Sequence, residues 1–444
     1  MFKTKISYLK QTIKSALVKR ISNAAKWSFI GAICQNALML LIGIVCIHIL
    51  GKETFGKLGI IRSTIQIFIV LGAVGMGSTA TKFIAEFRSK DLNNLKSIYS
   101  IVNIISFCTG LISLLFVLLL APKIAVYLKD YSLTSSIRIG GLLLFFTIIN
   151  SVQNGILSGL EQFKQIALNT IIGSIAEFIC IILGAYFFSL YGALLGYGIG
   201  FIVLSLLNHI SVRKNLKSLD VKFSFNTVHL KLLKKLIFFS IPLMFSSLLV
   251  APVMWFAQSI VARSTNFSEI AIYSVADQWR MVLLFVPSAL SRIVLPILSN
   301  LYSDNNMISY LKALKYNIIL NMSTTIISFI GLLLFSSFLL KLYGLEKIAI
   351  YPMLILGAST IFASIGNVVG QAIISRAKTW IGFLFNLLWG IMIILFTILF
   401  LNFFTGSQSL ALAVLSSYIL HTIFQSIYFY YITKNINTKQ EVKA

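Results

Sequence analysis

Four ionisable side chains interrupt long apolar stretches of the sequence: Arg62, Glu177, Asp277 and Arg280. A guanidinium keeps its charge when buried and can grip a phosphate through two parallel hydrogen bonds, so Arg62 and Arg280 are candidates for binding an anion. A buried carboxyl group can exchange a proton or an ion, because burial raises its pKa while a nearby arginine lowers it. Glu177 and Asp277 are therefore candidates for ion coupling, and Glu177 is the better one because it has no basic residue within a helical turn.

The same four residues also have a purely structural interpretation. Asp277 and Arg280 are three residues apart, share one face of a helix and can neutralise each other. Glu177 can pair with Arg62 and lock two helices together. The sequence leaves the anion site and the mutual neutralisation both open.

Uncharged amides form a second group of polar residues inside apolar stretches. They are Gln35, Asn36, Asn150, Asn154, Asn367 and Gln371. Amides can donate to and accept from sugar hydroxyls without a net charge, which makes these residues candidates for binding a sugar. Hydrogen bonding between helices is the alternative, and for any one of these amides it is the stronger expectation.

The composition shows which kind of element must position these residues. Hydrophobic residues make up 58% of the 444 residues, charged residues only 11%, and the mean hydropathy is +0.92. Soluble domains carry about 25% charged residues. The chain is therefore expected to be an all-α integral membrane protein. Its net charge of +25 then reflects the excess of Lys and Arg on the cytoplasmic side, and no nucleic-acid partner is expected.

Apolar runs of about 20 residues predict twelve spanning helices. We expect them at about 27–49, 55–77, 97–121, 135–158, 165–187, 191–211, 237–261, 270–298, 314–338, 350–374, 380–403 and 409–432. Most of the 37 Lys and Arg residues then fall in the termini and in the loops of one side, which predicts that both termini face the cytoplasm.

The domain organisation follows from the same count. It consists of a basic amphipathic cytoplasmic segment (1–26), a six-helix lobe (27–212), a basic cytoplasmic linker (213–235), a second six-helix lobe (236–433) and a cytoplasmic tail (434–444). The apolar residues of the first segment recur at spacings of three and four, as in a helix that lies on a membrane surface.

An internal repeat relates the two lobes. A shift of 217 aligns four polar pairs, namely Asn150 with Asn367, Asn154 with Gln371, Ser158 with Ser375 and Asn169 with Asn386. A shift of about 215 places Arg62 on Asp277. Because each lobe has an even number of helices, both have the same topology, and a pseudo-two-fold axis along the membrane normal is expected between them.

Signals for catalysis, cofactors and metals are not found in the sequence. It contains no phosphate-binding P-loop, no zinc-protease motif and no ligand-spaced pair of Cys or His, so neither an enzyme nor a metal or cofactor site is expected. The series Gly192, Gly196 and Gly200 lies within an apolar helix and indicates close helix packing.

Several short motifs resemble those of the polysaccharide flippases, a family of the multidrug-and-toxin-extrusion-like exporter superfamily. Residues 50–59 (LGKETFGKLG) resemble the turn between the first two helices of that family, and residues 83–86 (FIAE) resemble the motif that ends its second helix region. Residues 271–276 (AIYSVA), 285–291 (FVPSALS) and 295–296 (LP) are similar to its eighth helix, and Pro242 also fits.

The resemblance implies translocation of undecaprenyl-diphosphate-linked sugar units across the cytoplasmic (inner) membrane by alternating access, for surface polysaccharide biosynthesis. It also implies a basic central cavity, in which Arg62 and Arg280 hold the diphosphate, and partners among membrane lipids, a polysaccharide polymerase and a chain-length regulator. Two alternatives remain. A cation-coupled drug antiporter is expected to have an acidic cavity, and a membrane polysaccharide polymerase is expected to have a large external loop and no duplication.

Overall fold

The computed structural model describes residues 2–88, 91–224, 229–304, 306–376 and 378–441. Side chains are described for these residues except 2–21, 242–243, 245–247, 291–293, 296, 379 and 435–441. The expected cytoplasmic tail and the apolar face of the amphipathic segment fall largely outside this part, as do the side chains of Pro242 and Arg292.

The described chain is helical throughout, as the composition predicts. Its elements are α1 (Phe2–Ala73), α2 (Met76–Phe87), α3 (Leu92–Tyr127), α4 (Leu133–Gly159), α5 (Phe163–Lys217), α6 (Leu230–Ser247), α7 (Val250–Ser264), α8 (Phe267–Ser303), α9 (Met307–Leu342), the 3-10 helix η2 (Lys347–Ala349), α10 (Ile350–Ser375), α11 (Thr379–Phe400) and α12 (Gly406–Glu441).

Two of these elements each contain two predicted helices. α1 is broken at Gly51, where φ is 76°, and α5 is broken at Phe188 and Ser189, where the φ of Ser189 is 50°. When α1 and α5 are divided at these kinks, and α2 and α7 are joined to the segments before them, the described residues form the twelve predicted segments in order. Eight of the elements are long and apolar enough to cross a membrane.

Two predicted helices are interrupted, so their expected continuity is wrong. The helix expected at 55–77 stops at Ala73, turns at Val74 and Gly75 with φ of 44° and 66°, and continues as α2 to Phe87. The helix expected at 237–261 is divided into α6 and α7. Pro252 lies in the first turn of α7, where a proline is tolerated because its missing N–H has no partner inside the helix.

The chain forms two compact units. The first comprises residues 1–42, 65–125 and 132–245, and the second comprises 43–64, 126–131 and 246–444. Residues 43–64, around the Gly51 kink, thus group with the second half of the sequence. As a result Arg62, Asp277 and Arg280 all belong to the second unit.

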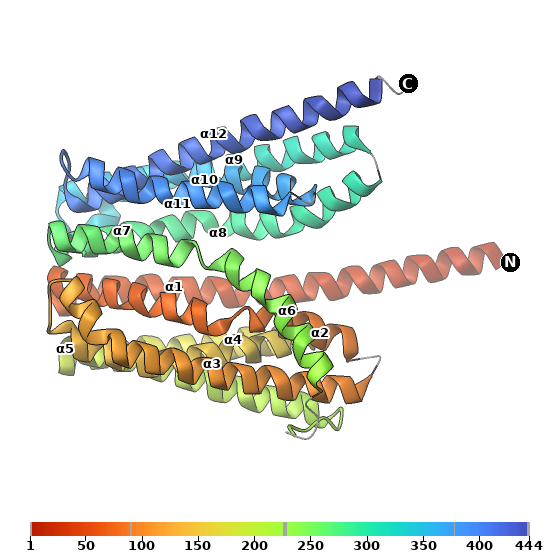
Figure 1. The fold of residues 1–444 in the computed structure, drawn as a ribbon, viewed down its shortest axis with the longest axis horizontal. Coiled ribbons are helices and arrows are strands. Elements are labelled where there is room, and N and C mark those ends of the chain that lie inside the picture. Colours follow the sequence, from red (N-terminus) through yellow and green to blue (C-terminus); the bar gives the residue numbers. More distant parts are fainter. Residues whose placement is uncertain (1, 89–90, 225–228, 305, 377, 442–444) are drawn as a thin grey trace. The chain divides into compact units, whose positions relative to one another are not determined.

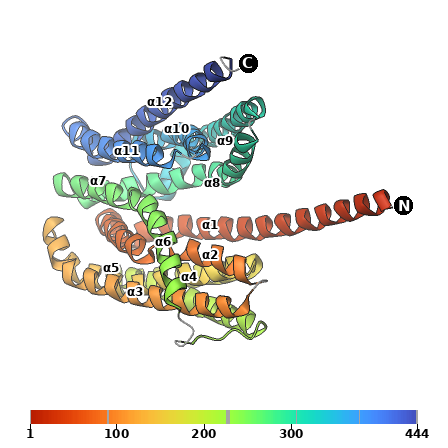
Figure 2. The same cartoon turned by 45° about the vertical axis from the view of Figure 1, so that its right-hand side comes forward.

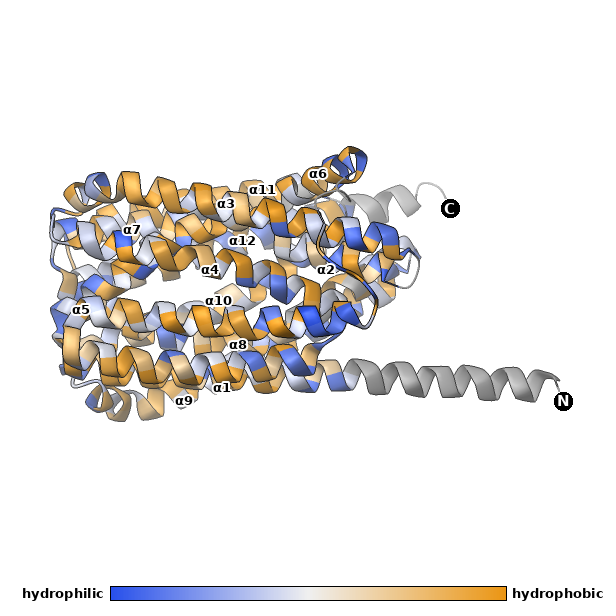
Figure 3. Cartoon of the chain, turned by 90° about the horizontal axis from the view of Figure 1, so that it is seen from below, coloured by the Kyte–Doolittle hydropathy of each residue, from blue (hydrophilic) through white to orange (hydrophobic). Residues whose placement is uncertain are grey.

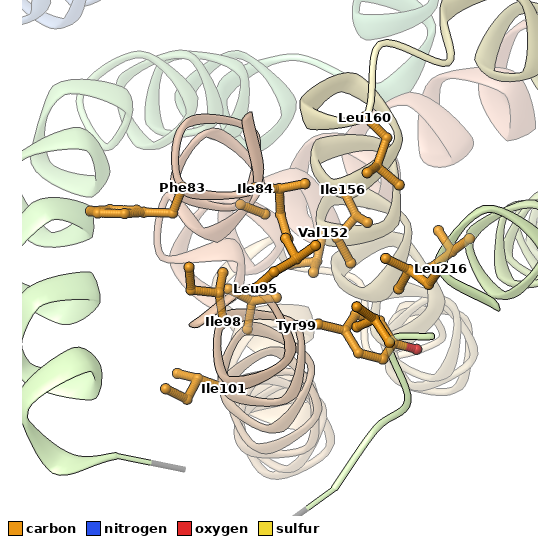
Figure 4. Packing of buried hydrophobic residues seen from close by; sticks show 14 of the residues in the cluster. Phe83, Ile84, Leu95, Ile98, Tyr99, Ile101, Val152, Ile156, Leu160 and Leu216 are labelled. Atoms are coloured by element: carbon orange, nitrogen blue, oxygen red, sulfur yellow. The ribbon is translucent and has the colours of Figure 1, made fainter. Parts of the chain in front are cut away.

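In the first unit, α4 packs against α2 and against α5. Large aliphatic and aromatic side chains from α2, α3 and α4, among them Phe83, Ile98, Tyr99 and Ile156, form one buried cluster, which Figure 4 shows from close by. Leu216 at the end of α5 completes it. This cluster fixes the ends of several helices against one another.

In the second unit, α10 is the central helix, because it packs against α8, α9 and α12. Figures 1 and 2 show these helices running alongside one another. Their buried cluster includes Val294, Leu298, Tyr310, Leu314 and Val368. These contacts place the polar faces of α8, α10 and α12 against each other.

Apolar side chains also cover the outside of the helices. Along α3, Phe107, Leu111, Leu115, Phe116 and Leu119 are all exposed. Figure 3 shows that apolar residues dominate the length of the helices and that hydrophilic ones gather towards the ends. An apolar surface of this kind is matched by lipid, so the chain is a multi-pass membrane protein.

The predicted close packing of the glycine series is confirmed. Gly192, Gly196 and Gly200 follow the kink in α5 and lie directly against Gly184, Cys180 and Glu177 before it. A Cβ atom at any of the three glycines would overlap these neighbours, so only glycine allows the two parts of α5 to approach so closely.

Candidate functional site

The charged pair on α8 forms inside the second unit. α8 begins at an Asn266 cap, whose side chain accepts a hydrogen bond from the Glu269 backbone N–H at 3.0 Å. Two to three turns further along, Arg280 Nε donates to Asp277 Oδ1 at 2.6 Å. The Arg280 side chain is 12% exposed and that of Asp277 is 24% exposed. The mutual neutralisation that the sequence left open is therefore present.

The Arg280 guanidinium reaches a second helix as well. It lies close to the Tyr418 hydroxyl on α12 and interacts with it electrostatically. A guanidinium has five N–H donors, so the bond from Nε to Asp277 leaves donors that can still bind an anion. Arg280 therefore links α8 to α12 and keeps part of its binding capacity.

Arg62 lies on the helix that packs along α8. A Cβ atom at Gly56 would lie 3.2 Å from the backbone N of Ala271, and one at Gly59 would lie 2.7 Å from Ser274 Oγ. The second contact lies three residues after the first on both helices. The residue pair three positions further along both helices is Arg62 and Asp277.

These contacts join residues that the sequence offset relates. Gly56 and Ala271 differ by 215, and so do Gly59 and Ser274, which is the offset that aligns Arg62 with Asp277. Both contacts lie inside the second unit.

The amides of the first unit form a buried network between α4 and α5. Asn208 is fully buried and donates to Asn150 Oδ1 at 3.3 Å and to Asn154 Oδ1 at 3.2 Å. Asn169 donates to Asn208 Oδ1 at 2.9 Å, and Asn150 donates to the Phe201 carbonyl at 3.0 Å. Asn150 and Asn154 thus have the interhelical role that was the stronger expectation for these amides.

The corresponding amides of the second unit border a cavity. Asn367 and Gln371 lie on α10 and are joined by a hydrogen bond of 3.3 Å from Gln371 Nε2. They line a cavity of about 290 Å³ together with Tyr418, His421 and Gln425 of α12. Asn367 is exposed, so these candidates for sugar contact remain accessible.

The remaining candidates lie in the first unit. Glu177 is half-buried and packs against Gly200, and it makes an interaction of its own. Gln35 is exposed and Asn36 is half-buried on α1. The structure thus places Asp277, Arg280 and the α10 amides in the second unit, while Glu177, Gln35 and Asn36 belong to the first.

Three side chains of this site were not among the predicted residues. Gln425 could have been found, because the shift of 217 places it on Asn208. Tyr418 and His421 are aligned by the same shift with Phe201 and Leu204, which carry no matching polar group. Only the packing of α12 against α8 and α10 reveals them.

A family model described as "Polysaccharide biosynthesis protein" matches residues 23–302. The chain belongs to the polysaccharide biosynthesis protein family. This match includes α8 and the charged pair, whereas α10 and α12 follow it. Among curated protein sequences, none matches.

Solved structures show that this family member has the fold of the MATE transporters of the MOP superfamily. It is similar to a multidrug resistance MATE family transporter in an inward-facing conformation, with a TM-score of 0.76 and 15% identity over 92% of this chain and 99% of the other. It is also similar to an outward-facing MATE transporter, with a TM-score of 0.66 and 17% identity over 94% of this chain and 96% of the other.

A third similar structure is a MOP superfamily transporter from Pyrococcus furiosus, which is described by a reverse polarity of its binding pocket. The TM-score is 0.69, with 16% identity over 94% of this chain and 96% of the other. The family and the fold together point to a transporter rather than to an enzyme, and they agree with the expected two-lobe architecture.

Proposed function

We propose that the chain is a flippase that moves undecaprenyl-diphosphate-linked oligosaccharide units from the inner to the outer leaflet of the cytoplasmic membrane by alternating access. The observation that carries the proposal is the contact between Arg280 and Tyr418. It places a permanent cation beside a cavity lined by neutral hydrogen-bonding groups. A lipid-linked sugar requires these two chemistries next to each other, one for its diphosphate and one for its hydroxyls.

The same cavity favours a glycan over a cationic drug. None of the described residues that line it is charged. An exporter of cations is expected to offer carboxylates to its substrate, because an unpaired cation in a membrane interior is costly. The drug antiporter therefore remains the second candidate, and it is distinguished by export of a cationic dye.

The test replaces Arg280 and Arg62 in turn by Ala and by Lys, and surface polysaccharide is measured at matched protein levels. We expect Ala at position 280 to lower export at least about tenfold, since a charge-assisted hydrogen bond contributes about 1.5–3 kcal/mol. Lys is expected to restore export only in part because it lacks the planar fork. Arg138→Ala is the control, because Arg138 is an exposed arginine at the start of α4. Full export by both Ala variants would contradict the proposal.

Ion coupling through Glu177 is a separate part of this proposal. Glu177 packs against Gly200 through its Cα, Cβ and Cγ atoms, so its carboxyl group is attached where the two parts of α5 meet. The test uses proteoliposomes with a fluorescent lipid-linked sugar and an imposed proton or sodium gradient. Gradient-driven accumulation that is lost in Glu177→Gln supports coupling. Equal, gradient-independent equilibration in both proteins contradicts it and leaves a facilitator. Asp277 is the less favoured candidate because Arg280 already holds its carboxylate.

A further inference from the structure

The cavity in the second unit has a closed counterpart in the first. At the shift of 217, each of the four amides in the closed network has an amide partner near the cavity. The pairs are Asn150 and Asn367, Asn154 and Gln371, Asn169 and Asn386, and Asn208 and Gln425. In the first unit these amides bond to one another, whereas in the second they surround about 290 Å³ of space.

Two glycines of α10 explain why the second cluster is open. Gly366 and Gly370 stand where the repeat has Ile149 and Gln153. Both glycines lie beside Gln425, and a Cβ atom at Gly370 would lie 3.4 Å from Gln425 Nε2. Because α10 has glycines where the first unit has Ile149 and Gln153, two side chains are absent and the cavity occupies their space. The two glycines of α10 therefore account for the cavity.

Buried polar atoms around the cavity have no partner among the described residues. They are Gln371 Oε1, Gln425 Oε1 and His421 Nδ1. Gln425 is 3% exposed and His421 is 8% exposed, so the protein shields both from bulk solvent. A buried polar atom without a partner is costly, and most such atoms in native proteins are satisfied. The geometry thus requires something in the cavity that supplies hydrogen bonds.

The hydrogen bond between Gln425 and His421 shows which of the atoms without a partner are donors and which are acceptors. Gln425 Nε2 can only donate, and it lies 3.1 Å from His421 Nε2, which must therefore accept. The imidazole is then neutral and carries its hydrogen on Nδ1. The cavity consequently presents two unsatisfied acceptors, the amide oxygens, and one unsatisfied donor, the His421 Nδ1–H.

This combination selects the chemistry of the ligand. A metal cation satisfies the two amide oxygens but is repelled by the N–H, and no charged residue lines the cavity to balance it. An anion satisfies the N–H alone. Hydroxyl groups both donate and accept and therefore satisfy all three. A cavity of about 290 Å³ lies at the small end of the range for ligand sites, which suits a single ring.

We propose that this cavity binds one neutral sugar ring of the carried glycan, held by Gln371, His421 and Gln425. This inference rests on the proposed function for the identity of its ligand. Tyr418 lines the cavity and also lies close to Arg280, so the proposed sugar ring and the proposed diphosphate-binding arginine are on opposite sides of one tyrosine. The first unit cannot bind a sugar in the same way, because its amides are already bonded to each other.

The test fills the cavity without replacing any of its polar side chains. In Gly370→Leu the new side chain enters the cavity, since the nearest atoms belong to the Gln425 amide and not to backbone. Gly331→Leu is the matched control, because Gly331 lies in a helix of the same unit with nothing within 4 Å of its Cβ position. Binding of glucose, galactose, mannose and N-acetylglucosamine is measured by saturation-transfer NMR on protein purified in nanodiscs.

We expect at least one hexose to bind the native chain and Gly331→Leu, and to bind at least tenfold more weakly to Gly370→Leu. Gln425→Leu, which removes an unsatisfied acceptor at similar volume, is expected to show the same loss and replaces Gly370→Leu if that variant melts early. Absence of hexose binding, or equal binding by both Leu variants, would overturn the inference. Binding of radioactive sodium that disappears in Gly370→Leu, without any effect on hexose binding, would overturn it as well.

A measurement of export separates this inference from the proposed function. If a strain lacking the chain stops exporting polysaccharide and Gly370→Leu restores export fully, the cavity is not a sugar site and the flippase proposal stands. If loss of the chain leaves export and lipid-linked intermediates unchanged, the flippase proposal fails. Hexose binding that is lost only in Gly370→Leu would even then support the sugar site.

Discussion

Asn208 and Gln425 occupy equivalent positions in the repeat, but their hydrogen bonds differ between the two units. Asn208 makes three hydrogen bonds with other amides, whereas Gln425 bonds only to His421 through its Nε2 and leaves its Oε1 unpaired among the described residues. The first arrangement holds helices together, and the second holds polar atoms ready for a ligand. An amide side chain at the same repeat position is thus structural in one unit and available in the other.

This difference predicts unequal effects on stability for the same type of substitution. Asn208→Leu removes the bonds to Asn150, Asn154 and Asn169 and is expected to destabilise the protein by about 2 kcal/mol, since an interhelical bond in a membrane contributes about 0.6 kcal/mol and unpaired partners add to the cost. Gln425→Leu is expected to leave stability within about 0.5 kcal/mol, because it loses one bond and one unpaired oxygen. Thermal unfolding in detergent measures both variants, and equal destabilisation would contradict the distinction.

A pH dependence is expected from an exposed pair at the end of the helices. Lys52 donates to Glu346 at 2.6 Å, and this ammonium lowers the pKa of the Glu346 carboxyl below its usual 4.5. The folded state therefore binds the proton less readily than the unfolded state, so the pair stabilises the protein above that value. The stabilisation is lost as the pH falls through the lowered pKa. Thermal unfolding between pH 3 and 7 is expected to depend less on pH in Glu346→Gln than in the native chain. An unchanged slope would contradict the pairing.

At the scale of elements, the part of α1 that follows Gly51 packs along α8 within the second unit. Gly56 and Gly59 let this helix approach Ala271 and Ser274 so closely that the register places Arg62 level with Asp277. The alignment of Arg62 with Asp277 was visible as an offset in the sequence, and the contacts of Gly56 and Gly59 with α8 have the same offset. Small residues are the means by which helices approach in a membrane.

Overpacking this contact is expected to impair both folding and transport. A side chain at Gly56 meets the backbone carbonyl of Phe267, which cannot rotate away, so Gly56→Val is expected to cost about 1–3 kcal/mol. Gly331→Val, with open space around it, is the control and is expected to behave like the native chain. Melting temperature and polysaccharide export are measured together, and normal behaviour of both variants would show that the helices do not pack as described.

At the scale of the whole molecule, the direction of transport depends on which side the termini face. The positive-inside distribution predicts that both are cytoplasmic, and this orientation remains a proposal. A cysteine at Ser218, after α5, is then expected to resist an impermeant thiol reagent added outside intact cells. A cysteine at Ser132, before α4, is expected to react, since both serines are exposed.

The labelling uses a background in which Cys34, Cys46, Cys108 and Cys180 are replaced by Ala, because these four thiols are free. Permeabilised cells, in which both introduced cysteines are expected to react, serve as the control. Reaction at Ser218→Cys and protection at Ser132→Cys would reverse the orientation and the proposed direction of transport.

The sequence by itself determined the helical membrane fold, the order of the twelve segments and the repeat. These features follow from composition, from the length of apolar runs and from residue offsets, all of which are local or periodic. The helix breaks at Val74–Gly75 and Leu248–Leu249 were not predicted from the sequence. An apolar run has the same composition and length whether the helix within it is continuous or interrupted.

Only the tertiary structure decided which polar residues are engaged and which are available. The sequence presents Asn150 and Asn367 as equals, since both are amides at matching positions of apolar helices. Their difference arises from what packs opposite them, namely Asn208 and Phe201 in one unit, and a space left by Gly366 and Gly370 in the other. Hydrogen bonds depend on atoms that meet across helices, and residue type alone cannot specify that meeting.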